Sequence, residues 1–396
     1  MNRIYMDNAA TTPVRAQVLE EMMPYFAELY GNPSGIYQTA GVSRSAIYDA
    51  REKVARVIGA SAEEIFFTGC GTESDNWALT GACATYGKGG GHIITCEIEH
   101  HAILHTCRHL EKKGVSVTYL PVDEYGIVDI DDLKGAIRDD TFLISIMYAN
   151  NEIGTIQPIK EIGEIARQRK IIFHTDAVQA VGHVPIDVRE LNVDMLSISG
   201  HKIYGPKGVG ALYIRKGVRP GNLLHGGAQE RGRRAGTENV PGIVGLGRAI
   251  ELAAAELEEE AARLISLRDR LIEGILSAVP YSRLNGHRTS RLPGNVNISF
   301  EFVEGESILL LLNDKGIAAS SGSACTSGDL DPSHVLLAIG LPHEKAHGSV
   351  RLTLGRYNTQ EEVNAVIRDL PPVIERLRSM SPLYEDFTSA GKALLR

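Results

Sequence analysis

The sequence predicts an α/β protein in which helices cover both faces of a mostly parallel sheet, followed by a smaller α+β domain. From about residue 45 to 250, short β-rich runs alternate with longer helical stretches, the order typical of parallel sheets. Strand interiors such as FLISIM and KIIFH are mostly apolar, as strands covered on both faces are. After a long Ala/Glu/Leu-rich stretch, the pattern changes to mixed strands and helices.

The alternating part can be followed element by element. EEIFFTG (63–69) reads as a strand and TESDNWALTGACATYG as the helix after it. HIITCEIE (92–99) is the next strand, and its helix ends at Gly114, since glycine commonly terminates helices. The series continues through SVTYLPV, TFLISIMYANNE, KIIFHTDAVQ, DMLSISGHK and GVGALYIRK.

The sequence from about residue 248 onward predicts a second domain. Residues 248–279 read as one or two helices, and NVNISFEF and GSVRLTLGR read as strands. Thr359 and Glu362 form a capping box at the start of a late helix. We expect a large α/β domain over 15–261, and a small α+β domain made of 1–14 with 262–396. The small domain carries a loop of small residues at 318–334, which contains Cys325.

Composition excludes several classes of function. The chain has 396 residues and a net charge of −8, which argues against binding to nucleic acid or to an anionic membrane. Its longest apolar run, near 308–312, is far too short for a membrane span, and the N-terminus lacks a signal-peptide core. The five cysteines are few and odd in number, which favours a reducing compartment. We expect a cytoplasmic protein.

A lysine at a strand end is the most informative candidate. Lys202 follows DMLSIS in the turn SGHK, at the carboxyl end where open α/β sheets bind ligands. A partly buried lysine there can form a Schiff base with a carbonyl group. A phosphate loop is rejected because Pro206-Lys207-Gly208 replaces the required Gly-Lys-Ser/Thr. An exposed surface lysine would be the default for an isolated residue.

Three further features share this sheet edge. Asp176 ends a strand and can pair with a pyridinium nitrogen, or it can cap a helix. The turn GCGTES (69–74) lets Gly71 approach a phosphate, and Thr72 adds a hydroxyl at the helix start. An ordinary capped helix is the alternative. His100 follows another strand, where it can stack on an aromatic cofactor and shuttle protons.

A histidine stripe offers a metal alternative. His101, His105 and His109 recur every fourth residue, with Cys107 nearby. The stripe could bind zinc, although no HExxH or paired CxxC motif accompanies it. A polar helix face is the simpler interpretation.

Cys325 differs from the other cysteines because it lies among Ser, Gly, Ala and Thr. A thiol in such a loop is accessible, and accessibility is what a nucleophilic thiolate requires. Cys83 and Cys107 fit the role of small buried hydrophobes.

Together these motifs resemble the cysteine desulfurases, pyridoxal-phosphate enzymes of the class V aminotransferase group (the NifS/IscS type). The order and spacing match over nearly the whole chain, in YMDNAATTP, GNPSG, GTESDN, EIEHHA, NNEIG, HTDAVQ, SGHKIYGPKG, RRAGTEN, SSGSACTSG and VRLTLGR. The resemblance implies the fold of pyridoxal-phosphate-dependent transferases (fold type I), with a seven-stranded sheet.

The resemblance also implies residue roles. Lys202 would hold pyridoxal 5'-phosphate covalently, Asp176 would pair with the ring nitrogen, Gln179 would bind the phenolic oxygen and His100 would stack on the ring. The remaining implied cofactor contacts are Gly71, Thr72, Asn151, Ser199, Gly200, His201 and, from a second subunit, Thr237. The substrate carboxylate would bind Asn151 and Arg351 with help from Asn32.

The implied reaction converts L-cysteine to L-alanine and leaves the sulfur as a persulfide on Cys325, with Lys202 and His100 moving protons. The acceptor would be a NifU/IscU-like scaffold in iron–sulfur cluster assembly, with nitrogenase-type maturation as one option. A homodimer without a resident metal is implied, although Cys325 could ligate a shared iron–sulfur cluster during transfer. The alternatives are a selenocysteine lyase, a small-amino-acid aminotransferase of the same fold, and a non-enzymatic metal-binding protein.

Overall fold

A computed structural model describes residues 3–321 and 332–394. Cys325 and most of the predicted 318–334 loop lie outside the described residues. In the part of the chain that is described, no helix is both long and apolar enough to cross a membrane.

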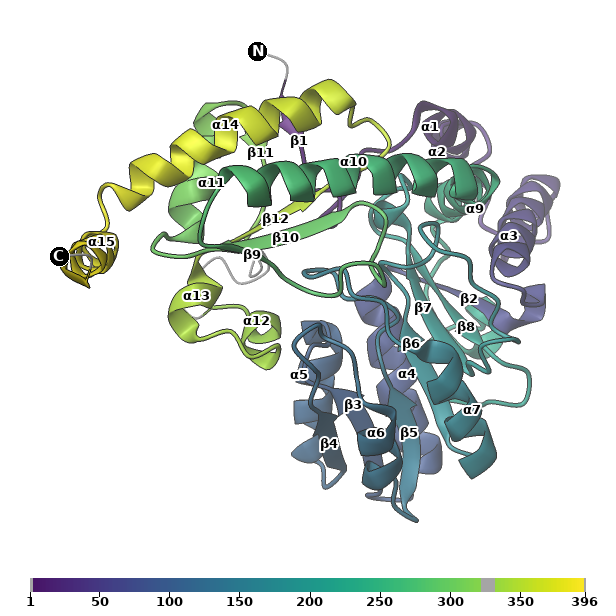
Figure 1. Cartoon of the computed structure of the whole chain (residues 1–396). Coiled ribbons are helices and arrows are strands. Elements are labelled where there is room, and N and C mark those ends of the chain that lie inside the picture. The colour runs from purple at the N-terminus through teal and green to yellow at the C-terminus, as the bar shows by residue number, and fades with distance from the viewer. Residues whose placement is uncertain (1–2, 322–331, 395–396) are drawn as a thin grey trace.

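A seven-stranded sheet forms the centre of the larger body (Figure 1). Its strands lie in the order β2-β8-β7-β6-β5-β3-β4, and all pairings are parallel except those of β8, which runs antiparallel to both neighbours. The α/β class with a mostly parallel sheet is therefore confirmed. The strands are β2 (Ile65–Thr68), β3 (His92–Cys96), β4 (Ser116–Leu120), β5 (Thr141–Ser145), β6 (Ile172–Asp176), β7 (Met195–Ser199) and β8 (Gly210–Ile214).

Helices cover both faces of this sheet. Alternate strand residues enter different hydrophobic clusters: Phe66 and Met195 pack with α4 and α5, whereas Phe67 and Leu196 enter the cluster on the opposite face. The helical segments of this part are α1 (Ala16–Met22), α2 (Pro24–Ala27), α3 (Gln38–Val57), η1 (Ala62–Glu64), α4 (Gly71–Tyr86), α5 (His101–Glu111), α6 (Ile130–Ala136), α7 (Ile159–Arg169), η2 (Gly200–Lys202), α8 (Gln229–Gly232) and α9 (Val240–Ala255).

The second body is built on a three-stranded antiparallel sheet, β12-β10-β9, and a two-stranded parallel pair, β1-β11. Figure 1 shows α10 and α14 running along the same side of the small sheet. Its elements are β1 (Ile4–Tyr5), α10 (Leu257–Ala278), β9 (Ser282–Leu284), β10 (Asn295–Phe300), α11 (Gly305–Asp314), β11 (Ile317–Ala318), α12 (His334–Ala338), α13 (His343–His347), β12 (Ser349–Thr353), α14 (Gln360–Arg378) and α15 (Pro382–Leu394).

Two sequence signals explain the helices around the join between the bodies. The Ala/Glu/Leu-rich stretch forms two helices, α9 and α10, because Glu256 leaves helical geometry between them. Thr359 and Glu362 make both hydrogen bonds of the predicted capping box. The division at residue 261 stays a prediction, and α10 runs across it.

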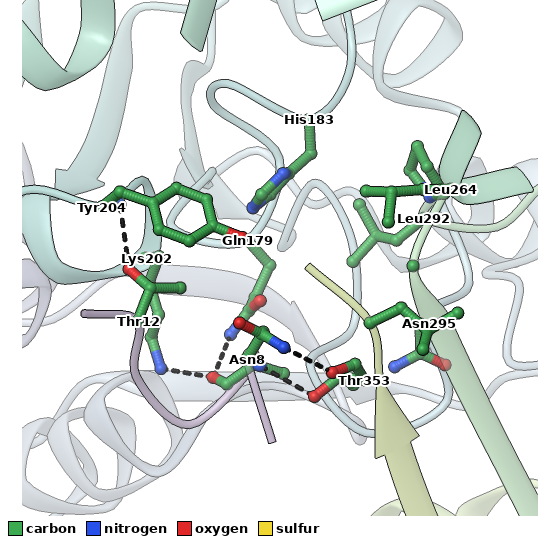
Figure 2. A pocket seen from close by; sticks show the side chains of 14 residues that line it. Asn8, Thr12, Gln179, His183, Lys202, Tyr204, Leu264, Leu292, Asn295 and Thr353 are labelled. Atoms are coloured by element: carbon green, nitrogen blue, oxygen red, sulfur yellow. Dashed lines mark hydrogen bonds between the residues drawn. The ribbon is translucent and has the colours of Figure 1, made fainter. Parts of the chain in front are cut away.

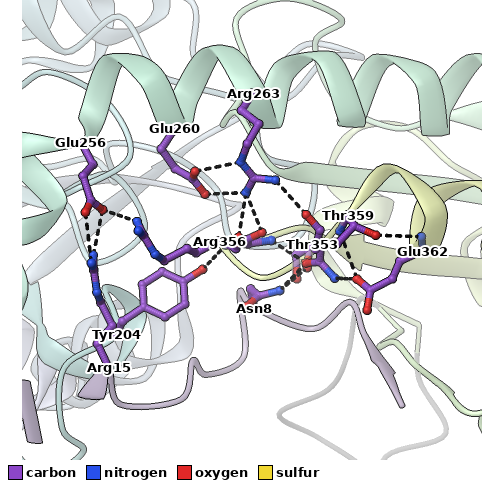
Figure 3. A network of polar contacts seen from close by, with 12 residues as sticks. Asn8, Arg15, Tyr204, Glu256, Glu260, Arg263, Thr353, Arg356, Thr359 and Glu362 are labelled. Carbon is purple, nitrogen blue, oxygen red and sulfur yellow. Dashed lines mark hydrogen bonds and ion pairs between the residues drawn. The ribbon is translucent and has the colours of Figure 1, made fainter. Parts of the chain in front are cut away.

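A polar network ties the N-terminal segment to α10 and to the loop before α14 (Figure 3). Glu256 forms ion pairs with Arg15 and Arg356. The backbone N–H of Arg356 donates to the Tyr204 hydroxyl at 2.6 Å. Tyr204 lies two residues after Lys202, so the network connects the smaller body to the lysine turn.

Candidate active site

A cavity of about 290 Å³ lies at the carboxyl ends of β5, β6 and β7, where parallel strands place ligands. The N-terminus of α4, the segment after β1 and a side chain from β12 complete its wall. It is lined by Ala9, Ala10, Cys70, Gly71, Thr72, Asp75, His100, Met147, Ala149, Asn151, Asp176, Val178, Gln179, Ser199, His201, Lys202 and Arg351.

The turn after β7 presents Lys202 to this cavity. Its Nζ donates to the carbonyl oxygens of Ala9 at 2.5 Å and Ala10 at 2.8 Å. Figure 2 shows Lys202 and Gln179 both pointing at the N-terminal segment, and the Gln179 amide also donates to Ala9 O, at 3.0 Å. Two carbonyl oxygens beside Nζ favour an ammonium group there.

Thr12 forms hydrogen bonds on both sides of Lys202 in the turn after β7. Its hydroxyl donates to His201 O at 2.8 Å and accepts from the backbone N–H of Tyr204 at 2.8 Å. Tyr204 adopts a left-handed backbone conformation with φ of 62°, which is uncommon outside glycine. The strained turn is therefore held from the N-terminal segment.

Asp176 lies at the end of β6 and is buried. Its Oδ1 accepts the backbone N–H of Val178 at 2.9 Å. Burial raises the pKa of this carboxyl, while His100 and Lys202 act in the opposite direction. Asp176 is thus a buried carboxyl with cationic support, suited to face a protonated ring nitrogen.

His100 is the N-cap of α5, and its Nδ1 accepts the backbone N–H of Ala102 at 3.1 Å. This bond assigns the proton of the neutral ring to Nε2. Burial lowers the pKa of His100, although the nearby Asp176 opposes that shift. The imidazole is therefore neutral and carries one proton available for transfer.

The N-terminus of α4 and the start of η2 form a concave wall. A Cβ on Gly71 would lie 2.7 Å from Val178 Cγ2, so only glycine leaves this approach open. Thr72, Ser199 and His201 line the same wall, whereas Gly200 is buried behind it and binds Val209 O through its N–H at 3.1 Å. Burial lowers the pKa of His201 to about 4.

Arg351 enters the cavity from β12 and is almost completely buried. Its Nη2 lies 3.0 Å from Asp7 Oδ1, and Nη1 donates to Asn151 O at 3.2 Å. Its Nε is buried and has no hydrogen-bond partner among the described residues. A guanidinium with an unused donor can bind a carboxylate.

Besides Gly200, two predicted site residues among those described, Asn32 and Thr237, do not line this cavity. Asn32 is exposed, and its Oδ1 accepts the Ser34 backbone N–H at 3.0 Å. Thr237 is exposed, and its predicted place is in the site of a second subunit. Cys325 lies outside the described residues.

Sequence reasoning missed four contributors to the site. Asp75 follows Gly71 by four residues on α4, a spacing that indicates a shared helix face. Cys70 is exposed and lines the cavity, and the strand-to-helix turn was the signal for it. Glu99 is buried beside the site, where burial raises its pKa to about 8. Asp7 reaches Arg351 from the N-terminal segment, and no local pattern indicates this contact.

The histidine stripe does not build a metal site in the described part of the chain. His101 and His105 stack with ring centroids 4.9 Å apart, and His334 lies 4.9 Å from His101. Burial, together with the neighbouring rings, lowers the pKa of His101 to about 4. Across the described residues, no group of three or more His, Cys, Asp or Glu side chains is arranged to hold a metal ion.

Comparisons with known proteins place this geometry in a class. Residues 4–366 match the aminotransferase class-V family model. The chain is 64% identical over 380 residues to a protein named cysteine desulfurase IscS of Methanosarcina thermophila, covering 96% of this chain and 94% of that protein. A Clostridium botulinum protein of the same name is 57% identical over 390 residues, with 98% of each chain covered.

Solved structures agree. A NifS-like protein superposes with a TM-score of 0.89 at 42% identity, covering 94% of this chain and 99% of that one. A structure described as SspA in complex with cysteine gives a TM-score of 0.80 at 40% identity, over 90% and 100% of the two chains.

The fold and site define a pyridoxal-phosphate-dependent enzyme of fold type I, of the aminotransferase class-V family. Within that family, the chain belongs to the NifS/IscS-like cysteine desulfurases. Pyridoxal phosphate is its cofactor, and the residues present fit it: a lysine, a buried carboxyl, and a wall that a Cβ on Gly71 would fill.

Proposed function

We propose that this protein takes sulfur from L-cysteine, leaves L-alanine, and passes the sulfur through Cys325 to an iron–sulfur scaffold protein. One observation carries the proposal: Lys202, Asp176 and Arg351 line a single cavity although they come from three separate elements. Respectively, they can hold a carbonyl cofactor, face a ring nitrogen and bind an amino-acid carboxylate.

The cofactor, when bound, supplies an electron sink for the α-carbon of an amino acid. We assign its ring nitrogen to Asp176, its phenolic oxygen to Gln179 and its ring face to His100. The phosphate would be held by the wall of Gly71, Thr72, Ser199 and His201, close to the positive end of the α4 dipole.

The chain's own side chains then bind the substrate and move its protons. Arg351 orients the substrate carboxylate through its unused Nε. Lys202 Nζ takes the α-proton, and the carbonyls of Ala9 and Ala10 stabilise the ammonium group that results. His100 moves a proton through Nε2, the nitrogen that its helix-capping bond leaves available.

Cys325 thiolate is assigned the attack on the substrate sulfur. A sulfur–sulfur bond forms while the carbon–sulfur bond of the substrate breaks. The electron pair of that broken bond stays with the carbon skeleton, which takes up a proton and leaves as alanine. The sulfur then moves to the thiol of a scaffold protein by exchange.

A homodimer is part of this proposal. Large apolar side chains are exposed along the first three helices and the loop between them, including Met23 at 54%, Phe26 at 59%, Tyr30 at 77% and Ile36 at 100%. A grouping of this kind marks a protein interface. The exposed Thr237 fits a role in the partner's site. Light scattering of the purified protein tests this, and a monomer would exclude a shared site.

The proposed activity is tested with the purified protein, pyridoxal phosphate and L-cysteine. We expect alanine and transferable sulfur in equal amounts, and none of either from Lys202→Ala. Borohydride reduction should fix the cofactor on the peptide that contains Lys202. Pyruvate formation from alanine without release of sulfur would instead identify an aminotransferase. Fixation of the cofactor on another lysine would contradict the assigned site.

A further inference from the structure

A second buried carboxyl group, Asp75, lines the cavity that contains Asp176. Its side chain belongs to the second turn of α4, and the residue is 1% exposed. Its Oδ1 is buried and has no hydrogen-bond partner within the described residues. None of the roles proposed above uses this group.

The neighbouring histidine does not neutralise Asp75. His174 binds Ser145 Oγ through Nδ1 at 2.9 Å and Ser197 Oγ through Nε2 at 3.0 Å. Its Nε2 lies 3.7 Å from Asp75 Oδ1, beyond hydrogen-bond distance. Burial lowers the pKa of His174 to about 3, so this ring is neutral beside the carboxyl.

The two carboxyl groups have different surroundings. Asp176 accepts the backbone N–H of Val178 and lies near Lys202, and both favour its ionised form. Burial raises the pKa of Asp75 well above its ordinary value, and repulsion from Asp176 and Glu99 adds to the effect. The Ser197 hydroxyl opposes it. When two carboxyl groups share a buried site, the pKa of one of them is strongly raised.

We propose that Asp75 is a positioning residue that keeps its proton, so that it and Asp176 together present one negative charge to the ring nitrogen of the cofactor. An ionised Asp75 would be a second hydrogen-bond acceptor beside Asp176. With its proton, the unpartnered oxygen of Asp75 becomes a donor instead. One charge matches the single positive charge of a protonated ring. This inference rests on the proposed location of the ring nitrogen at Asp176.

The test compares holoenzyme variants that separate charge from hydrogen bonding. Asp75→Asn keeps the size and a donor but cannot ionise, whereas Asp75→Ala removes both carboxyl oxygens. Asp176→Asn tests the location of the ring nitrogen, and Glu97→Gln, at an exposed carboxyl two residues before Glu99, is the matched control. The readouts are the pH titration of the cofactor's absorption, the Kd for pyridoxal phosphate, and the infrared band of a protonated carboxyl group.

For Asp75→Asn, we expect the absorption midpoint to stay within about 0.3 pH units and the Kd within about threefold of wild type. The infrared spectrum should lose the protonated-carboxyl component of Asp75 in this variant, while the component of Glu99, whose pKa is also raised to about 8, remains. Asp75→Ala should weaken cofactor binding by about tenfold or more. If the alanine variant fails to fold, Asp75→Asn and the infrared band decide.

A shift of about one pH unit or more in Asp75→Asn, or an infrared band that this substitution leaves unchanged, would overturn the proposal. If the role of Asp75 fails this test but Asp176→Asn shifts the absorption midpoint or the Kd for pyridoxal phosphate, the location of the ring nitrogen at Asp176 still stands. An Asp176→Asn enzyme that titrates like wild type would refute both the location of the ring nitrogen and the role of Asp75.

Discussion

Replacing Arg351 with alanine should remove the receptor for the substrate carboxylate. The guanidinium contacts Asp7 Oδ1 and Asn151 O, and its Nε is the donor left for a ligand. A hydrogen bond to a charged group contributes about 1.5–3 kcal/mol. One such bond from Nε to a carboxylate, taken at the upper end, contributes about 3 kcal/mol, which corresponds to a loss of about 160-fold in kcat/KM.

The assay compares L-cysteine with cysteamine, which carries the same amine and thiol but no carboxylate. Wild type should strongly prefer L-cysteine, and Arg351→Ala should bring the two kcat/KM values close together. Arg368→Ala is the control, because Arg368 is exposed and pairs with Asp369 at the surface. The reasoning is refuted if Arg351→Ala retains the preference for L-cysteine, or if it lowers kcat/KM equally for both substrates.

Three further predictions follow from packing and charge. Gly71→Ala places a methyl group 2.7 Å from Val178 Cγ2, and overpacking of this kind costs about 1–3 kcal/mol. Fluorescence titration should therefore show a cofactor affinity about tenfold weaker. Unchanged affinity would argue against a cofactor contact at Gly71. Glu230→Ala leaves the buried Arg51 unpaired and should lower the free energy of unfolding by about 3–5 kcal/mol in denaturant titrations, and a loss below about 1 kcal/mol would contradict this. The pKa of His174 is about 3 in the folded state and about 6.5 when unfolded. The stability that comes from the neutral His174 is therefore complete above about pH 6.5 and is lost as the pH falls toward 3. The denaturant midpoint of His174→Gln should decline less between about pH 7 and 5 than that of wild type. An equal decline would refute the lowered pKa of His174.

The residues at strand ends were predictable from sequence because parallel strands end at one edge of a sheet. Lys202, Asp176 and His100 each follow an apolar run, and the structure brings all three to one cavity. The α4 start at Gly71 was predictable for the same reason. The antiparallel β8 was not, since an apolar run carries no information on strand direction.

The contacts made by the N-terminal segment could not be predicted from the sequence in this way. Asp7 and Arg351 are 344 positions apart in the chain, and the carbonyls that hold Lys202 belong to two alanines with no functional side chain. These contacts exist because β1 pairs with β11 and carries the following residues across the site. Periodicity describes which face of an element is buried, but not which distant segment covers it.

The central claim is that sulfur leaves L-cysteine on Cys325. Among the described residues, Cys70 is a competitor for this role, because it is exposed and lines the cavity. The most direct test is to treat the holoenzyme with L-cysteine, alkylate it, and locate the extra sulfur by peptide mass spectrometry. We predict a persulfide on Cys325, together with loss of alanine formation in Cys325→Ala but not in Cys70→Ala. A persulfide on Cys70, or full turnover by Cys325→Ala, would contradict the account.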